Sequence, residues 1–459
     1  MAGFAALTLV CPAVSRAQQT TASAGLFSRS VPARVATTEP IALPLGEAIG
    51  RALETNLGLL VAEQQRTSAR GARWLALSAL LPQVDARVAE TRQVVNLAAF
   101  GFPLPAGAAP IVGPFNVFDA RLSLAQPVFD LRALQAARAG RHARDAADFG
   151  LQSARELVVL VTTDTYLRAL AAASRAESVR AQLRTAEALH TQALDLKNAG
   201  IVAGIDALRA ELQVSIQRQR VSAAQNEADK SRLQLSRVVG LAPGQPFTLA
   251  TDVPELPSPA LTLEEALVRA RAARPDYQGA LARVRAAEAT HRAAVAESLP
   301  SVQLTANYGA IGRTASSAER TYAVAGAVTI PVFSGGRRLG HRLAAEAEME
   351  TRRAEADDLL GAIDFEVRSS FLDVRSSEEQ LHVAGQARAL ADEQLVQARD
   401  RLAAGIATSV EVVQAQEAVA LANDQYIAAL YGANRARAAL AWDLGEAEAS
   451  ARRDIGGLR

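Results

Sequence analysis

The sequence predicts a mainly α-helical fold with a smaller β part, built from two copies of one unit. The chain has 459 residues, of which 49% are hydrophobic but only 4% aromatic, a balance typical of long, closely packed helices rich in alanine. Four short motifs recur in the same order roughly 200 residues apart. Between these motifs, the spacing of apolar residues changes from helical to alternating and back to helical.

The four repeated motifs define the duplication. They are Leu43–Ile49 and Leu261–Leu267, Leu81-Pro82 and Leu299-Pro300, Gln126–Asp130 and Ile330–Ser334, and Ala199–Ile201 and Ala404–Ile406. We therefore expect repeat 1 at residues 43–240, a linker at 241–260, repeat 2 at 261–445, and a C-terminal tail at 446–459. Each repeat should contain a helix, a strand pair, a long helix and a return helix.

The N-terminus has the pattern of a secretory signal. An apolar run from Gly3 to Val14 precedes Ala17, which suits cleavage, so we expect a signal peptide at residues 1–17 and an extended segment at 18–42. The single cysteine, Cys11, lies inside the apolar run. It is either part of the signal or a lipid-acceptor cysteine. Without it, the mature chain has no thiol for a disulfide or a metal site.

Each repeat begins with a predicted helix. Leu45, Ile49 and Ala52 follow helical spacing in the first repeat, and Leu263, Leu267 and Ala270 do so in the second. Both helices should end at a proline, Pro82 or Pro300, because proline disfavours the helical conformation of the residue before it.

Strand pairs are expected next, within residues 83–126 and 301–331, where apolar and polar residues alternate. Four strands of about ten residues each can cross a bilayer when they are tilted. The joining loops are expected at 96–114 and 311–320. The aromatic residues concentrate in or beside the strands, which fits interfacial girdles.

Long helices should follow each strand pair for about seventy residues, or roughly 100 Å, and end at Gly200 and Gly405. Return helices should run from Asp206 to about Val239 and from Glu411 to about Leu444. In the last helix, apolar residues seven apart form one seam, and a second seam lies on the same helix. The first seam includes Val412, Val419 and Tyr426, and the second includes Val413, Ala420 and Ile427. A hollow helical cylinder and a solid bundle explain this pattern equally well.

The number of strands constrains the assembly. Four strands are too few to close a membrane barrel, and an open sheet in lipid leaves costly unpaired backbone groups. The chain must therefore share a barrel with other copies or form a soluble sheet.

Several of these segments resemble TolC-type outer-membrane efflux proteins. The resemblance rests on Leu-x-Leu-x-Glu-Ala at 43–48 (with Pro44 and Gly46 at the variable positions) and 261–266, Pro-Val-Phe-Asp/Ser at 127–130 and 331–334, and the Ala-Gly-Ile turns, and it spans about residues 41–445. It implies a homotrimer with a twelve-stranded β-barrel in the outer membrane, continued by an α-helical barrel through the periplasm. Such a trimer is the passive exit duct of a tripartite efflux or type I secretion system, with a periplasmic adaptor and an inner-membrane pump as partners.

Two departures from the family pattern are visible. The residue three before the tip glycine is often aromatic in the family but is Lys197 or Leu402 here. An Asn-Pro pair often found in the first helix is Asn56-Leu57 in this chain, and Pro275 follows Arg274 in the second repeat.

The candidate functional positions lie at the two hairpin turns. Gly200 and Gly405 suit tight turns between helices, and the resemblance implies that Gly200, Ile201, Gly405 and Ile406 form the periplasmic tip that docks an adaptor. Asp206 and Glu411 either stabilise the helix N-termini or form an acidic ring at the pore entrance, six carboxylates in a trimer, that favours cations. The expected mechanism is an iris-like opening at these acids.

Other functions find little support. The net charge of +1 gives no reason to expect a nucleic-acid partner. The five histidines are scattered, so we expect no metal, no cofactor and no enzymatic activity. No run of eighteen apolar residues follows the N-terminus, so no transmembrane helix is expected. A periplasmic adaptor or a soluble coiled-coil scaffold remains the alternative.

Overall fold

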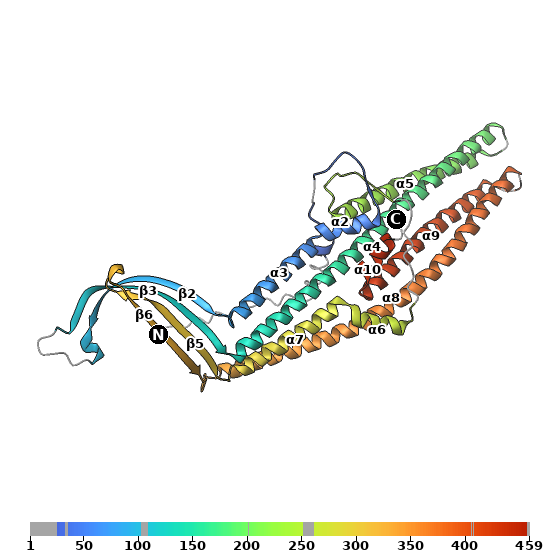
Figure 1. Ribbon diagram of the computed structural model, residues 1–459. Coiled ribbons are helices and arrows are strands. Elements are labelled where there is room, and N and C mark those ends of the chain that lie inside the picture. The colour runs from blue at the N-terminus through green and yellow to red at the C-terminus, as the bar shows by residue number, and fades with distance from the viewer. Residues whose placement is uncertain are drawn as a thin grey trace, which may run out of the picture. The chain divides into compact units, whose positions relative to one another are not determined.

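The computed structural model describes residues 25–32, 35–101, 109–200, 202–250, 261–404, 406 and 408–456. The predicted signal peptide and Cys11 lie outside these ranges. The chain forms two units: unit 1 contains residues 1–64, 149–278 and 358–459, and unit 2 contains residues 65–148 and 279–357. Unit 2 holds the sheet, and unit 1 holds the ends of the helical hairpins (Figure 1).

The sheet of unit 2 joins the two repeats. Its strands are β2 (Gln83–Asn96), β3 (Ile111–Phe129), β5 (Ser301–Gly312) and β6 (Glu319–Thr329), in the antiparallel order β2-β3-β5-β6. Strand β3 of the first repeat pairs with β5 of the second. β2 and β6 are therefore the edges of the sheet. The first pair is longer than predicted because β3 begins at Ile111, inside the expected loop, and pairs there with the end of β2.

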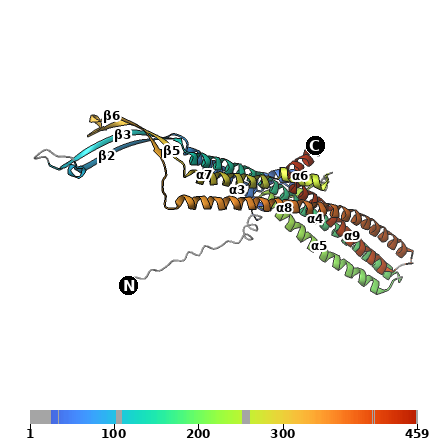
Figure 2. The same ribbon diagram turned by 90° about the horizontal axis from the view of Figure 1, so that it is seen from below.

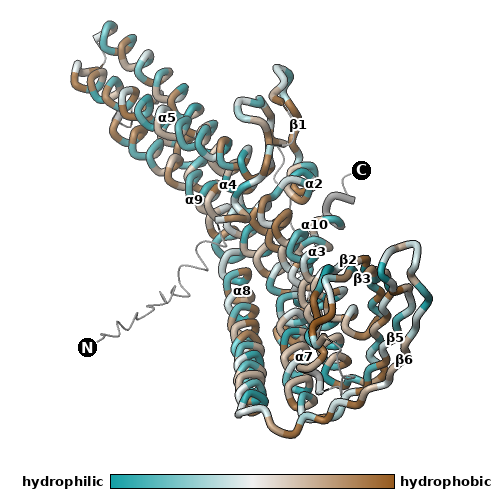
Figure 3. Tube along the Cα trace, turned by 90° about the vertical axis from the view of Figure 1, so that its left-hand side faces the viewer, coloured by the Kyte–Doolittle hydropathy of each residue, from teal (hydrophilic) through white to brown (hydrophobic). Residues whose placement is uncertain are grey.

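The register gives the sheet one apolar and one polar face. Val84 lies opposite Leu124, which lies opposite Ala306, which in turn lies opposite Val324. The side chains of Val84 and Val324 are 64% and 66% exposed in the single chain. The other face carries polar pairs such as Ser123 and Asn307. Figure 3 shows brown and teal residues along the strands, and side chains of the apolar face are exposed in the single chain.

Helices continue each strand. α3 (Leu57–Ser78) and α7 (Pro275–Ala296) lead into the strand pairs, while α4 (Leu131–Asn198) and α8 (Arg337–Ala403) follow them. In unit 2, α3 packs closely on α4 at Gly140, where an added Cβ would lie 3.3 Å from Cβ of Ala76. The Arg66–Asp148 ion pair joins the same two helices, at 2.6 Å.

Unit 1 contains the remaining helices. α5 (Gly204–Val239) and α9 (Ser409–Asp443) return along α4 and α8, which gives two helical hairpins that lie side by side in both ribbon views (Figures 1 and 2). Around their middle lie α2 (Leu45–Thr55), α6 (Leu263–Ala273), α10 (Ala447–Gly456) and the parallel strands β1 (Ile41–Leu43) and β4 (Phe247–Leu249).

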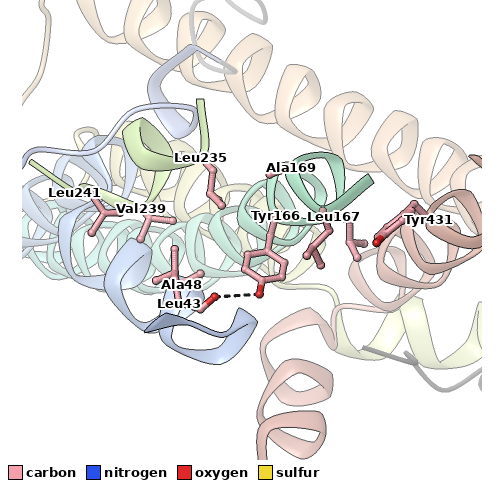
Figure 4. Close-up of a cluster of buried hydrophobic side chains, with 10 residues drawn as sticks. Leu43, Ala48, Tyr166, Leu167, Ala169, Leu235, Val239, Leu241 and Tyr431 are labelled. Atoms are coloured by element: carbon pink, nitrogen blue, oxygen red, sulfur yellow. Dashed lines mark hydrogen bonds between the residues drawn. The ribbon is translucent and has the colours of Figure 1, made fainter. Parts of the chain in front are cut away.

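The largest apolar cluster of unit 1 brings both hairpins together. Tyr166 of α4 is buried in this cluster beside Leu235 of α5 and Tyr431 of α9 (Figure 4). The Tyr166 hydroxyl donates to the carbonyl of Leu43 at 3.0 Å, so the buried phenol has a partner. A stretch of α4 is long and apolar enough to span a membrane by length and composition, which the sequence did not predict, but 56% of that stretch is buried inside the protein.

The first helix of each repeat is divided, where one continuous helix was expected. α2 ends at Asn56 and α6 ends at Arg274, and both residues have extended backbone conformations, with ψ of 127° and 117°. In the second repeat, Pro275 excludes Arg274 from the helical region. In the first repeat there is no proline. There the Asn56 amide holds the break, accepting from the backbone N–H of Gly58 at 2.9 Å and donating to the Phe27 carbonyl at 2.8 Å.

Both terminal segments have more structure than the sequence suggested. Residues 25–31 of the expected extended segment pack at the α2–α3 break, where Ser30 and Asn56 form an isolated β-bridge. The expected C-terminal tail contains α10, which is fixed to α4 by the Arg155–Glu448 ion pair at 2.6 Å. Residues 251–260 of the expected linker lie outside the described ranges.

Candidate functional site: the ends of the two helical hairpins

The first hairpin turns between α4 and α5. Gly200 has a left-handed backbone with φ of +75°, a conformation that favours glycine, and its N–H donates to the Lys197 carbonyl at 3.0 Å. α5 then begins at Gly204, and Asp206 lies in its first turn. The predicted docking residue Ile201 lies outside the described part of the chain.

The second hairpin turns between α8 and α9. The N–H of Ile406 reaches back to the Arg401 carbonyl at 2.9 Å, which is a bond of the Schellman type that closes a helix C-terminus. The Ile406 side chain is 72% exposed. Glu411 lies in the first turn of α9. Gly405, whose place in the turn was predicted, is not among the described residues.

Each predicted pore acid pairs with an arginine of its own hairpin. Asp206 lies 3.3 Å from Arg209, one helical turn later on α5. Glu411 lies 3.4 Å from Arg401, on the opposite side of the turn at the end of α8. All four side chains are partly exposed, so each pair is worth at most about 1 kcal/mol. The acids also lie at helix N-termini, where the helix dipole favours negative charge.

Exposed apolar side chains surround the tips. On α5 they follow helical spacing on one face, and on α9 they begin in the first turn. These side chains are Ile205 (52% exposed), Leu208 (61%), Leu212 (61%) and Val410 (39%). Below this layer, Leu189 of α4 packs on the buried residues Ala398, Val412 and Ala415 of the second hairpin. The tips therefore combine an internal core with an apolar surface that is exposed in the described part of the chain.

Polar contacts connect the two hairpins further from the tips. Arg175 of α4 pairs with Asp424 of α9 at 2.9 Å, and Arg435 of α9 pairs with Asp164 of α4. Between them, the hydroxyls of Ser174 and Tyr431 lie 2.9 Å apart. α9 thus packs against α8 on one side and against α4 on the other.

The sequence identified the acids but not their partners. Arg209 could have been inferred from its position three residues after Asp206 on one helix. Arg401 could not, because ten residues and a turn separate it from Glu411. The exposed apolar face of α5 (Ile205, Leu208 and Leu212) was also missed. Apolar residues at helical spacing predict a buried face, and only the positions of the neighbouring helices show that this face is exposed.

Comparisons with known proteins agree on the class of fold. Residues 48–241 and 266–446 match the family model described as outer membrane efflux protein. The chain is 24% identical over 390 residues to the pyoverdine export outer membrane protein OpmQ of Pseudomonas putida, covering 82% of this chain and 80% of that protein.

Two solved structures show the same fold. One is the outer-membrane channel OprN, with a TM-score of 0.75, 21% identity, and coverage of 88% of this chain and 90% of that one. The other is the open state of the MtrE outer membrane channel of Neisseria gonorrhoeae, with a TM-score of 0.75, 17% identity, and coverage of 91% and 95%.

Proposed function

Because this chain belongs to the outer membrane efflux protein family, we propose that three copies assemble into one passive export duct that opens at the hairpin tips. The protein is an efflux channel component of the outer membrane that extends into the periplasm. The arrangement of the chain supports the shared duct, because its sheet has two open edges, β2 and β6. In lipid, such edges need partners.

The helices also have unpartnered seams. On α8, Phe365 and Leu372 lie seven residues apart and are 73% and 64% exposed, and Val383 and Leu390, again seven apart, are 51% and 67% exposed. A seven-residue apolar spacing is the pattern of a coiled-coil seam. We propose that these seams pack against the helices of a neighbouring copy. The same assembly would pair the open sheet edges and close both a β-barrel and a ring of helices. Three chains would contribute twelve strands, consistent with the family resemblance.

The tips are the proposed gate and docking site. The exposed side chains of Ile205, Leu208 and Ile406 offer an apolar surface to a periplasmic adaptor, beside Gly200, Ile201 and Gly405. In the trimer, Asp206 and Glu411 would place six carboxylates around the entrance, each with its arginine. An inner-membrane pump would supply the energy, and the duct itself would carry out no catalytic turnover.

The ion pairs at the tips suggest two gate mechanisms that one experiment separates. The test uses purified protein in planar bilayers. It compares the double variant Asp206→Asn/Glu411→Gln with the double variant Arg209→Gln/Arg401→Gln. If the acids set ion selectivity, the first double variant shifts the reversal potential towards anions and the second towards cations. If the pairs only clamp the tip, both variants raise the conductance equally.

Unchanged selectivity and conductance in both variants would refute a gate at these acids. The matched control is Asp229→Asn with Glu417→Gln. Asp229 and Glu417 are also exposed acids of α5 and α9, but they do not lie in a first helical turn. We expect this control to behave like the wild type.

A further inference from the structure

The helix ends next to the sheet carry an unusual excess of positive charge. Residues 64–84 and 131–144 contain seven arginines and no acidic residue, and the first nine residues of α8 add three more arginines without an acid. The seven are Arg66, Arg70, Arg73, Arg132, Arg138, Arg141 and Arg144, and the three are Arg337, Arg338 and Arg342. The net charge of +1 for the whole chain conceals this local concentration.

Few of these arginines are neutralised within the chain. Arg66 and Arg144 pair with Asp148, and Arg338 donates to the carbonyls of Pro331 and Val332, which precede α8. The others make no ion pair with the described residues. Among them Arg70, Arg132, Arg138, Arg141, Arg337 and Arg342 are exposed.

Part of this charge lies where the helix dipole disfavours it: Arg132, Arg337 and Arg338 are in the first turns of α4 and α8. At α4 this charge is offset by Asp130, which directly precedes the helix and accepts from the N–H of Ala133 at 2.9 Å. α8 has no acid in its first turn, although the helix dipole favours negative charge there. At the opposite hairpin ends, α5 and α9 begin with acids, as expected. The helix dipole therefore does not explain why Arg132, Arg337 and Arg338 lie at these helix starts.

Large apolar side chains are exposed in the same region of unit 2. Trp74 is 67% exposed and follows Arg70 by one helical turn on α3. Phe333, just before α8, is 88% exposed, and Leu339 in its first turn is 60% exposed. Arginine together with exposed tryptophan and phenylalanine is the composition of a membrane interface. Along the helix axes, Arg70, Trp74 and Leu339 lie within about 15 Å of the helix ends next to the sheet.

From this charge and composition we infer that the arginines and exposed aromatic side chains at the base of the sheet form a docking surface for the phosphate headgroups of anionic phospholipids. The surface would hold the protein at a fixed depth in the membrane, with the apolar band of the sheet in the hydrocarbon and the guanidinium groups at the phosphates. The inference rests on the membrane position that the proposed function gives to the sheet.

The test measures the thermal unfolding of the purified full-length protein in dodecyl maltoside with added phosphatidylglycerol or phosphatidylcholine. Phosphatidylglycerol should raise the Tm more than phosphatidylcholine does, and the difference should shrink in high salt. In Arg132→Gln/Arg138→Gln/Arg337→Gln/Arg342→Gln the difference should fall by at least half. If the quadruple variant does not fold, the α4 pair and the α8 pair are tested separately.

A matched control removes the same number of charges from unit 1. Arg220, Arg232, Arg368 and Arg375 are exposed and make no ion pair with the described residues, so their replacement by glutamine should preserve the phosphatidylglycerol effect. An equal response to both lipids, or a full response in the quadruple variant, would overturn the inference. So would an equal rise in Tm with inorganic phosphate, which would indicate a free-anion site.

Bilayer recordings separate this inference from the proposed function. A quadruple variant that inserts and conducts with an unchanged lipid response refutes only the docking surface. A wild-type protein that never conducts would refute the duct.

Discussion

Asn56 and Arg274 occupy equivalent positions in the two repeats and hold the same backbone break by different chemistry. Asn56 is fully buried, and its amide bonds to three backbone groups, those of Phe27, Gly58 and Leu59. The Arg274 side chain is only 4% exposed and pairs with Asp276 at 2.6 Å and with Glu366. It also lies 3.9 Å from Asp443 and 4.9 Å from the Trp442 ring centroid. One junction is therefore neutral and the other is ionic.

The ionic junction should make stability depend on pH. Burial raises the pKa of Asp443 from its ordinary value of 3.8 to about 6, against the opposing effects of the Ser370 hydroxyl and Arg274. Because the folded protein then binds this proton more tightly than the unfolded chain does, the contribution of Asp443 to stability falls as the pH rises from about 4 to about 6. The change amounts to at most about 3 kcal/mol.

Asp443→Asn should remove this dependence while keeping the shape of the side chain. We expect the variant to gain Tm relative to the wild type at pH 7.5 and to lose that advantage at pH 4.5, as measured by thermal circular dichroism in detergent. A difference between the two proteins that stays constant across this range would contradict the assignment.

The neutral junction predicts a loss of stability without pH dependence. Asn56→Ala removes the hydrogen bonds of this amide and leaves the Phe27 carbonyl without that donor, which should cost about 1–3 kcal/mol. Asn226→Ala, an exposed site on α5, is the matched control and should change the Tm little. Equal effects of the two substitutions would mean that the Asn56 side chain does not hold the break.

Among the elements, α4 of the first hairpin and α9 of the second form the main contact between the two hairpins. Tyr431 is 4% exposed and belongs to the central apolar cluster, whereas the Arg175–Asp424 pair is largely exposed. Buried aromatic area contributes far more than an exposed ion pair.

The contact between the hairpins can be ranked by substitution. Tyr431→Ala should cost about 3–5 kcal/mol, Tyr431→Phe about 1 kcal/mol through the lost Ser174 hydrogen bond, and Arg175→Gln less than about 1 kcal/mol. The check is the order of the three Tm values in detergent. An ion-pair variant less stable than Tyr431→Ala would contradict this ranking.

For the whole molecule, the open edges predict an oligomer. β2 and β6 are unpaired on their outer sides within the sheet of one chain, and the apolar sheet face is exposed. We expect the protein to require detergent for extraction from outer membranes and to migrate as a trimer that becomes a monomer on heating. A monomer released by osmotic shock would contradict both the shared barrel and the membrane position of the sheet.

Much of the fold followed from local patterns. Alternation located the four strands of the larger sheet but not β1 and β4, and the turn motifs located both hairpins, because these signals depend on neighbouring residues. The break at Arg274 could have been predicted from Pro275. The break at Asn56 could not, because it depends on a contact with Phe27, 29 residues earlier in the chain. The same limit applies to Arg401 as the partner of Glu411.

By itself, the sequence determined the duplication, the order of the four sheet strands and the hairpin helices, and the positions of the hairpin turns, because repeats and periodicity are properties of the chain. Only the tertiary structure decided that β3 pairs with β5, that α9 packs on both α8 and α4, and that Arg66 of α3 pairs with Asp148 of α4. These arrangements join residues far apart in the chain, and packing, not local preference, selects them.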